Sequence, residues 1–293
     1  MRLRRSLIDI DDLSVDELTY IFDRARTFEV SPPGALLAGV AVANIFFEES
    51  TRTFASFNLA ERRLGMDVIN LASHDMSLST KGETIDDTVI TLAAMGCQVL
   101  VVRHKEDGFA EHVASVFNGH VINAGDGINA HPTQGLLDVY TIREEFGSLS
   151  DRRVAIVGDV VHSRVAHSTM KGLKQFGAQV ILVGPECFLE KGERDFDAVL
   201  PMVDAVVMLR IQRERFSSMP ISDRNYVAGY QLNEARLRKL KRGAIVMHPG
   251  PYNRGMEIDE SVLAFSGWRY AQQVANGVAI RMALLDFLVH GAR

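Results

Sequence analysis

Short apolar runs alternate with amphipathic stretches along most of the chain. In the first half, such runs lie at residues 40–47, 67–71, 98–102 and 120–124. Each is bounded by polar or turn-forming residues, which predicts a buried strand. Between them, apolar residues at near-helical spacing predict helices, as from Phe54 to Leu64, where Gly65 ends the pattern. Before the first strand, Ser14 and Glu17 have the spacing of a capping box, which predicts a helix that begins after Ser14. Strands that alternate with helices in this way predict a parallel sheet.

The same pattern restarts after the segment "GSLSD" at 147–151. Further apolar runs predict strands at 153–158, 178–184, 204–209 and 244–248, and "NEARLRKL" at 233–240 predicts a helix. The sequence therefore predicts an α/β protein with two doubly wound parallel-sheet domains joined by helices. We place the first domain at 1–147, completed by a C-terminal helix at about 276–293, and the second domain at 148–275. The segment 147–151 is expected to act as the hinge between them.

Composition and charge narrow the classes of function. The 293-residue chain is 47% hydrophobic and 24% charged, and its net charge is −5 without a block of Lys or Arg. These values are ordinary for a globular protein and argue against a nucleic-acid partner. The segment "MRLRRSLIDIDDL" meets Asp9 before an apolar core develops, so it does not fit a signal peptide. No apolar stretch approaches the ~18 residues that a membrane helix needs.

Cysteine usage points to a reducing compartment. Cys97 and Cys187 lie far apart and have no metal-binding spacing. We expect free thiols, a cytoplasmic protein and no metal site.

A dense group of hydrogen-bond donors stands between the first predicted strand and the helix that follows it. In "FFEESTRT" at 46–53, Ser50, Thr51 and Thr53 supply hydroxyls and Arg52 supplies a planar guanidinium. A helix N-terminus carries unsatisfied N–H groups and a positive dipole end, so it favours a phosphate. A Ser or Thr at this place is also a common N-cap. The residues alone leave both interpretations open.

Other polar residues of the first half fall at comparable places. Arg103 ends the run "QVLVVR", and His131 and Gln134 lie around a predicted helix start in "AHPTQG". His131 could donate to a developing oxyanion, although capping or core histidines are more common. Ser77 and Lys81 lie in the long polar segment "SHDMSLSTKGET". Loops of that length inside a domain are often functional, but a solvated loop is the alternative.

The second half repeats this arrangement of polar residues after strands. Arg164 stands at a predicted helix start in "GDVVHSRVAHS", which lacks the G-x-G-x-x-G pattern of a dinucleotide site. Arg210 and Gln212 have the spacing of one strand face and could hold a carboxylate, or could form a charged edge. The segment "HPGPYNRG" at 248–255 predicts a rigid turn, and Gly250 and Pro251 could present backbone carbonyls to a ligand.

Taken together, these segments resemble the aspartate/ornithine carbamoyltransferase family along nearly the whole chain. The motifs that carry the resemblance occur in the family's order: "FFEESTRT", "STKGET", "VVRH", "HPTQGLLD", "GDVVHSRVAHS", "LRIQRERF" and "HPGPYNRG". The likeness is closer to the members that use aspartate, because the ornithine members carry a cysteine in the turn that is "HPGP" here. The segment 185–204 is shorter than is usual in the family.

The resemblance implies transfer of a carbamoyl group from carbamoyl phosphate to the amine of L-aspartate, an early step of pyrimidine synthesis that needs no cofactor. It assigns phosphate binding to Ser50, Thr51, Arg52, Thr53 and Arg103, with Ser77 from a neighbouring subunit. It assigns polarisation of the carbamoyl carbonyl to Arg52, Thr53 and His131. It assigns the carbamoyl amino group to Gln134, Gly250 and Pro251, and the aspartate carboxylates to Arg164, Arg210, Gln212 and Lys81.

The resemblance also implies a homotrimer with shared active sites, in which Ser77 and Lys81 act in the neighbouring subunit. Regulatory or dihydroorotase chains are further partners that it allows. Two other functions stay open at this point. One is carbamoyl transfer to a different amine, such as ornithine, and the other is a non-catalytic phosphate-binding or scaffold subunit.

Overall fold

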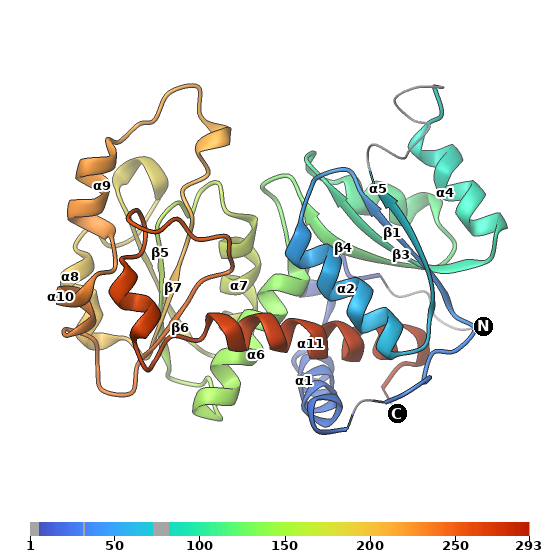
Figure 1. Cartoon of the computed structure of the whole chain (residues 1–293), viewed down its shortest axis with the longest axis horizontal. Coiled ribbons are helices and arrows are strands. Elements are labelled where there is room, and N and C mark those ends of the chain that lie inside the picture. The colour runs from blue at the N-terminus through green and yellow to red at the C-terminus, as the bar shows by residue number, and fades with distance from the viewer. Residues whose placement is uncertain (1–5, 32, 73–81, 293) are drawn as a thin grey trace. The chain divides into compact units, whose positions relative to one another are not determined.

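The computed structural model describes residues 6–31, 33–72 and 82–292. The chain forms two compact units, residues 1–137 with 274–293 and residues 138–273 (Figure 1). The division falls inside a helix, between Leu137 and Asp138, whereas the sequence prediction placed a boundary at residue 147. The boundaries of the functional domains stay a prediction.

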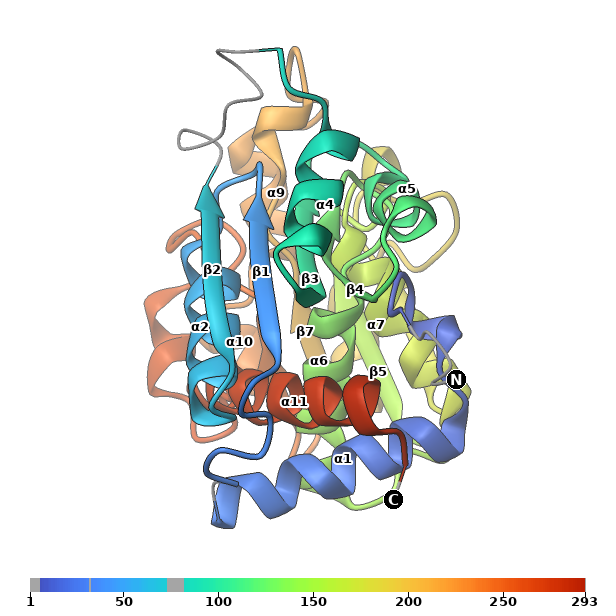
Figure 2. The same cartoon turned by 90° about the vertical axis from the view of Figure 1, so that its right-hand side faces the viewer.

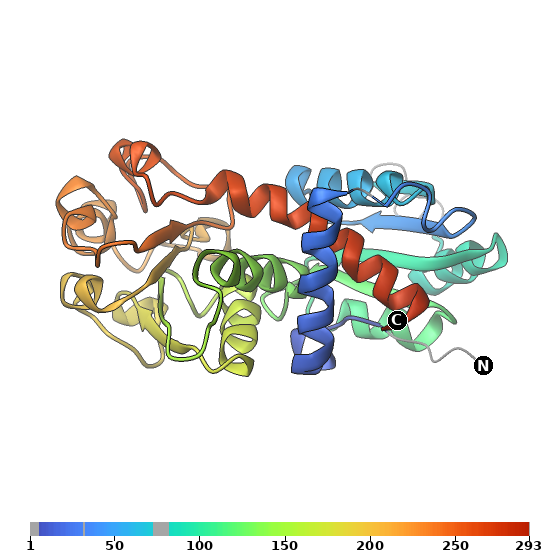
Figure 3. The ribbon, with the colours of Figure 1, turned by 90° about the horizontal axis from the view of Figure 1, so that it is seen from below.

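The first unit is built on a four-stranded parallel sheet in the order β2-β1-β3-β4. Its strands are β1 (Ala41–Phe46), β2 (Asp67–Ala72), β3 (Cys97–His104) and β4 (His120–Asp126). One face is covered by α2 (Thr51–Arg63) and the other by α4 (Ile85–Ala94) and α5 (Phe109–Val116), as Figure 2 and Figure 3 show. This placement follows from right-handed crossovers, because the chain reverses its direction across the sheet after β2.

Local sequence signals account for the helices of this unit. The first long helix, α1 (Val15–Val30), begins with a capping box in which Ser14 Oγ accepts from the Glu17 N–H and Glu17 accepts from the Ser14 N–H. After α2 the chain turns at Gly65, which has a φ of 75°. The buried apolar residues of β1, β3, α4 and α5 then form one core cluster on the α4 and α5 face of the sheet.

The second unit contains another four-stranded parallel sheet, in the order β6-β5-β7-β8. Its strands are β5 (Arg153–Val157), β6 (Gln179–Val183), β7 (Ala205–Met208) and β8 (Ile245–Met247). Its helices are α7 (Arg164–Gln175), α8 (Phe196–Val199), α9 (Asp223–Tyr230) and α10 (Glu234–Leu237). In Figure 1, α7 lies on one side of this sheet and the other three lie on the opposite side. The two parallel sheets confirm the predicted fold class.

Two long helices contribute residues to both units. They are α6 (Pro132–Phe146) and α11 (Tyr270–His290). Short 3-10 helices complete the described structure: η1 (Ile10–Asp12), η2 (Glu186–Phe188), η3 (Leu200–Met202), η4 (Arg213–Arg215) and η5 (Glu260–Ala264). In the part of the chain that the structure describes, no helix is long and apolar enough to cross a membrane.

The structure corrects two local predictions. The apolar pattern at 233–240 predicts a helix of that length, but α10 ends at Leu237. Arg210 and Gln212 were expected on one face of a strand, but β7 ends at Met208 and both residues lie in the loop that follows. The apolar run is longer than the strand, because Leu209 is buried in the core although it lies beyond the last paired residues of the sheet, Met208 and Val157.

Candidate active site

In the first unit, the predicted anion-binding residues follow the carboxyl ends of adjacent strands. Phe46, the last residue of β1, pairs with Arg103 in β3, and His104 at the end of β3 pairs with Asp126 at the end of β4. Because the strands are parallel, these ends lie at one edge of the sheet, the usual place for ligands in open α/β sheets. The start of α2, Arg103 and the start of α6 therefore gather at that edge.

The start of α2 has the geometry of an anion site more than that of a self-contained cap. Ser50 is the N-cap residue, yet its side chain makes no capping hydrogen bond. Thr51 and Arg52 are exposed and Thr53 is buried. An edge-to-face contact between Phe46 and Phe54, with 5.4 Å between ring centroids, holds the helix start against the end of β1. The hydroxyls and N–H groups there can serve a ligand.

Arg103 is held in a fixed position by neighbours from β4 and from the loop after β1. One guanidinium nitrogen donates to the Ala124 carbonyl at 3.0 Å, and another donates to Glu48 Oε1 at 2.9 Å. Only 7% of the residue is exposed. A guanidinium so restrained can meet an anion without losing much side-chain freedom.

His131 and Gln134 lie at the start of α6 and are both buried. The carbonyl of His131 accepts from the backbone N–H of Gln134 at 3.0 Å, which begins the helix. The preceding loop is fixed by buried Asp126, which accepts from the N–H groups of Gly108 and Ala130. These contacts set the position from which the imidazole of His131 can reach a ligand.

Arg281 of α11 connects the starts of α2 and α6. Its guanidinium donates to Ser56 Oγ at 2.9 Å and to Thr133 Oγ1 at 3.4 Å. It is 3% exposed. Nothing in the sequence marks Arg281 as a connecting residue, because an arginine inside an amphipathic helix carries no local signal of what it contacts.

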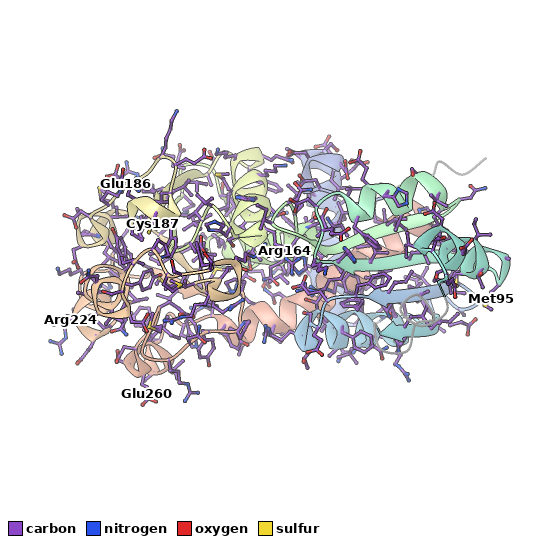
Figure 4. The ribbon with its side chains drawn as sticks, turned by 90° about the horizontal axis from the view of Figure 1, so that it is seen from above. Met95, Arg164, Glu186, Cys187, Arg224 and Glu260 are labelled. Carbon is purple, nitrogen blue, oxygen red and sulfur yellow. The ribbon has the colours of Figure 1, made fainter. Side chains whose placement is uncertain are left out.

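In the second unit, polar residues follow the carboxyl ends of β5, β7 and β8. Arg164 is the first residue of α7 and is largely buried (Figure 4). Its neighbour Ser163 caps the helix, because its Oγ accepts from the Ala166 N–H at 3.2 Å. Arg210 and Gln212 follow β7, and the turn 248–255 follows β8.

A buried carboxylate joins two of these loops. Asp159 is fully buried, and its Oδ1 lies 2.7 Å from His162 Nδ1 in the loop after β5. Its Oδ2 accepts from the Gln212 N–H at 3.4 Å in the loop after β7. Asp159 therefore connects the segment that carries Arg164 to the segment that carries Gln212. The side chain of Gln212 also accepts from Arg215 Nε at 3.0 Å.

The turn after β8 is closed by its own histidine. His248 Nδ1 accepts from the Gly250 N–H at 2.8 Å, and the His248 N–H donates to Gln273 Oε1 at 2.9 Å. Gly250 has a φ of 68°, a conformation that glycine adopts without strain. Pro251 follows it and is exposed.

The predicted residues thus fall into two groups, one at the sheet edge of each unit. Ser77 and Lys81 lie outside the described residues. The sequence does not single out Asp159, because a buried acidic residue after a strand has the same sequence pattern as a solvated one. Among the residues that the structure describes, no group of three or more His, Cys, Asp or Glu side chains could hold a metal ion.

Two protein-family models together match most of the chain. A model of the aspartate/ornithine carbamoyltransferase carbamoyl-phosphate-binding domain matches residues 5–144, and a model of the Asp/Orn-binding domain matches residues 191–288. The chain belongs to the aspartate/ornithine carbamoyltransferase family. The resemblance inferred from the motifs is thereby confirmed.

Curated members of this carbamoyltransferase family extend the similarity over nearly the full chain. The aspartate carbamoyltransferase catalytic subunit of Acidothermus cellulolyticus is 44% identical, covering 99% of this chain and 94% of its own length. The corresponding subunit of Salinispora arenicola is 48% identical over 87% of this chain and 86% of its own length.

Solved structures of the carbamoyltransferase family agree with the fold. Aspartate transcarbamoylase from Trypanosoma cruzi, in complex with carbamoyl aspartate and phosphate, is 31% identical with a TM-score of 0.87, covering 96% of this chain and 94% of that one. The catalytic subunit of M. Jannaschii aspartate transcarbamoylase is 32% identical with a TM-score of 0.86, covering 97% and 98%.

Proposed function

We propose that this protein transfers the carbamoyl group of carbamoyl phosphate to the amine of L-aspartate, giving N-carbamoyl-L-aspartate and phosphate in pyrimidine biosynthesis. The observation that carries the proposal is the 44–48% identity, over most of the chain, to curated aspartate carbamoyltransferase catalytic subunits. The polar groups at the two sheet edges support it, because they suit two anionic substrates.

The group in the first unit would bind the phosphate and the carbonyl oxygen of carbamoyl phosphate, and Gly250 and Pro251 of the second unit would add to the binding of its amino group. Ser50, Thr51, Arg52, Thr53 and Arg103 would hold the phosphate, with Ser77 supplied by a neighbouring subunit. The uncapped start of α2 and the restrained guanidinium of Arg103 support this role. Arg52, Thr53 and His131 would donate to the carbonyl oxygen, and Gln134 with the backbone of Gly250 and Pro251 would hold the amino group.

The group in the second unit would bind aspartate. Arg164, Arg210 and Gln212 would pair with the two carboxylates, and Lys81 of a neighbouring subunit would complete the set. Two carboxylates need cations or multiple donors, which these residue types provide. The tether from Asp159 to the Gln212 N–H supports a fixed geometry for this group.

The chemistry then needs no covalent enzyme intermediate. The lone pair of the aspartate amine attacks the carbamoyl carbon, and a tetrahedral oxyanion forms. The bond from that carbon to the phosphate oxygen breaks as the carbonyl re-forms, and the departing phosphate takes the amine proton. Donors aimed at the oxyanion contribute ~3–4 kcal/mol per well-placed group. Holding the two anions together removes an entropic cost of ~7–11 kcal/mol.

An amine-selectivity assay tests the proposed function. Purified protein would be supplied with radiolabelled carbamoyl phosphate and each of a panel of amino acids that includes aspartate and ornithine. We expect labelled carbamoyl aspartate and no labelled citrulline. Transfer to ornithine would favour the alternative substrate, and binding of carbamoyl phosphate without any transfer would favour a scaffold subunit.

We further propose a cytoplasmic homotrimer in which each site borrows Ser77 and Lys81 from a neighbour. Cys97 and Cys187 are free cysteines, which supports a reducing compartment. Mixed trimers of inactive Lys81→Ala and inactive Arg52→Ala chains should regain activity, since some sites then have every residue intact. Absence of recovery in mixed trimers verified by native mass spectrometry would contradict the shared site. The same spectra would reveal any regulatory or dihydroorotase chain that co-purifies with the trimer.

A further inference from the structure

The turn after β8 is held by a buried carboxylate that has no role in the function proposed above. Glu257 lies shortly after the turn and is 0% exposed. Its Oε1 accepts from the Asn253 N–H at 2.6 Å and lies 3.4 Å from His248 Nε2. One carboxylate oxygen therefore contacts both the first residue of the turn, His248, and Asn253 near its end.

The hydrogen bonds of His248 define where its proton lies. Nδ1 accepts from the Gly250 N–H at 2.8 Å, so it cannot itself carry a proton. The ring proton is consequently on Nε2, the nitrogen that faces Glu257. A carboxylate opposite Nε2 favours this tautomer, and this tautomer keeps Nδ1 available to the Gly250 N–H. Glu257 thus acts on Gly250 through the imidazole.

The backbone of Glu257 is anchored as firmly as its side chain. Its carbonyl accepts from the Leu232 N–H at 2.9 Å, and Leu232 also forms a bridge with Ile258. At the other end of the turn, the His248 N–H donates to Gln273, whose Nε2 donates to Asp138 at 2.9 Å. The turn is therefore fixed by side chains at both ends.

Burial of the Glu257 carboxylate opposes folding, so the stability of the turn alone does not explain why a carboxylate is there. Desolvation of an ionised group opposes folding unless several donors compensate. Glu257 also affects a neighbouring buried group. Burial, and then the nearby charges of Glu257 and Asp159, raise the pKa of the fully buried Tyr226 hydroxyl. An apolar residue at position 257 would avoid this cost, but it would leave the Asn253 N–H without its acceptor and would remove the carboxylate oxygen that lies 3.4 Å from His248 Nε2.

We propose that Glu257 is a positioning residue for carbamoyl transfer: through His248 and Asn253 it sets the Gly250–Pro251 backbone that receives the carbamoyl amino group. The inference rests on the proposed function. Glu257 should therefore affect how the carbamoyl group is oriented, and it should not affect the phosphate-binding residues of the first unit.

The test compares Glu257→Gln with Glu257→Leu in the full-length protein. Glutamine keeps an oxygen that can accept from the Asn253 N–H and lie beside His248 Nε2, whereas leucine roughly keeps the volume and removes that oxygen. We expect Glu257→Gln to stay within about threefold of wild type and Glu257→Leu to lose about 100-fold in kcat/KM for carbamoyl phosphate, because a displacement of about 1 Å has effects of that size. Calorimetry with inorganic phosphate should give the same Kd for both variants.

A control and a second variant keep the result interpretable. Glu260→Leu changes an exposed glutamate in η5 (Figure 4) and should leave kcat and KM at wild-type values. If Glu257→Leu does not fold, His248→Asn provides the test, since asparagine can accept from the N–H two residues ahead but cannot reach Glu257. We expect that variant to lose activity about tenfold while it keeps its affinity for phosphate.

The possible failures are distinct. Wild-type protein that makes no carbamoyl aspartate would overturn the proposed function and this inference with it. Active wild type with Glu257→Leu as active as Glu257→Gln would overturn the inference alone. Equal losses in both variants, or a loss of phosphate affinity that follows a lowered Tm, would show a purely structural role and would also overturn it.

Discussion

The two sheet edges hold their candidate ligand groups by different means. In the first unit, the groups come from regular elements: the start of α2, a residue within β3 and the start of α6. In the second unit, Arg210, Gln212, Gly250 and Pro251 come from loops, and only Arg164 comes from a helix. Those loops depend on the fully buried carboxylates Asp159 and Glu257.

The difference predicts where substitutions will act. A helix start presents its N–H groups through the helix itself, so only direct ligand residues should be sensitive there. Loops have no such internal support, so residues beneath them should affect catalysis without touching a substrate. In the first unit, catalysis should therefore be sensitive only to substitution of residues that contact a substrate. In the second unit, it should also be sensitive to substitution of residues that support the loops.

The largest effect is expected at Arg52 in the first unit. Arg52→Ala should lower kcat/KM by about 1,000-fold, because the proposed role combines phosphate binding with polarisation of the carbonyl. The measurement is carbamoyl aspartate formation, with circular dichroism to verify folding. Arg63→Ala is the matched control, since Arg63 is an exposed arginine at the end of the same helix. Near-normal activity in Arg52→Ala would count against the assignment of this edge.

Asp159 tests the indirect sensitivity of the second unit. Asp159→Asn places an amide donor opposite either the Gln212 backbone N–H or the His162 backbone N–H, so one of the two loops loses its acceptor and should move. We expect kcat/KM for aspartate to fall by about 100-fold. The KM for carbamoyl phosphate should change much less. A uniform loss for both substrates would mean that Asp159 supports the whole fold and not this group.

The smallest effect on catalysis, and the clearest effect on stability, is expected at Glu61, a buried residue of α2. Glu61 Oε2 accepts from Asn44 Nδ2 at 2.8 Å, and burial raises the pKa of Glu61 from its ordinary 4.5 to about 7. Among the described residues, neither Glu61 Oε1 nor Asn44 Oδ1 has a hydrogen-bond partner. A protonated Glu61 could donate from Oε1 to Asn44 Oδ1 and complete a two-bond pair.

The sign of the pH effect follows from the raised pKa. Below pH 4.5 both folded and unfolded chains keep Glu61 protonated, and its contribution to stability is complete. From pH 4.5 to about 7 only the unfolded chain ionises, so the free energy of unfolding falls as pH rises. Glu61→Gln should abolish that fall and be more stable than wild type at pH 8 by up to about 3 kcal/mol.

Urea unfolding between pH 4.5 and pH 8.5 measures this effect. The two proteins should converge in stability at the acidic end and diverge as the pH rises. Activity at pH 8 should stay within about threefold of wild type, because the variant can still pair with Asn44. Parallel stability curves would show that Glu61 is not protonated in the folded chain.

The sequence predicted most of the fold because each buried strand is a short apolar run between turn residues. The capping-box spacing of Ser14 and Glu17 likewise predicted the start of α1. The length of α10 was wrong, because an amphipathic pattern does not show where tertiary packing ends a helix. The candidate ligand residues were predictable from motifs, whereas Asp159, Glu257 and Arg281 were not. Their roles depend on neighbours more than fifty residues away or on burial, which the sequence pattern does not report.

The central claim is that cationic groups of both units serve one pair of anionic substrates. Calorimetric titration with N-(phosphonacetyl)-L-aspartic acid tests it, because this ligand joins a phosphonate to two carboxylates. Wild type should bind it far more tightly than phosphate or aspartate alone. Arg52→Ala and Arg210→Ala, one from each unit, should each weaken it by at least about 100-fold. Tight binding that survives either substitution would contradict the claim, since one group alone would then account for the affinity.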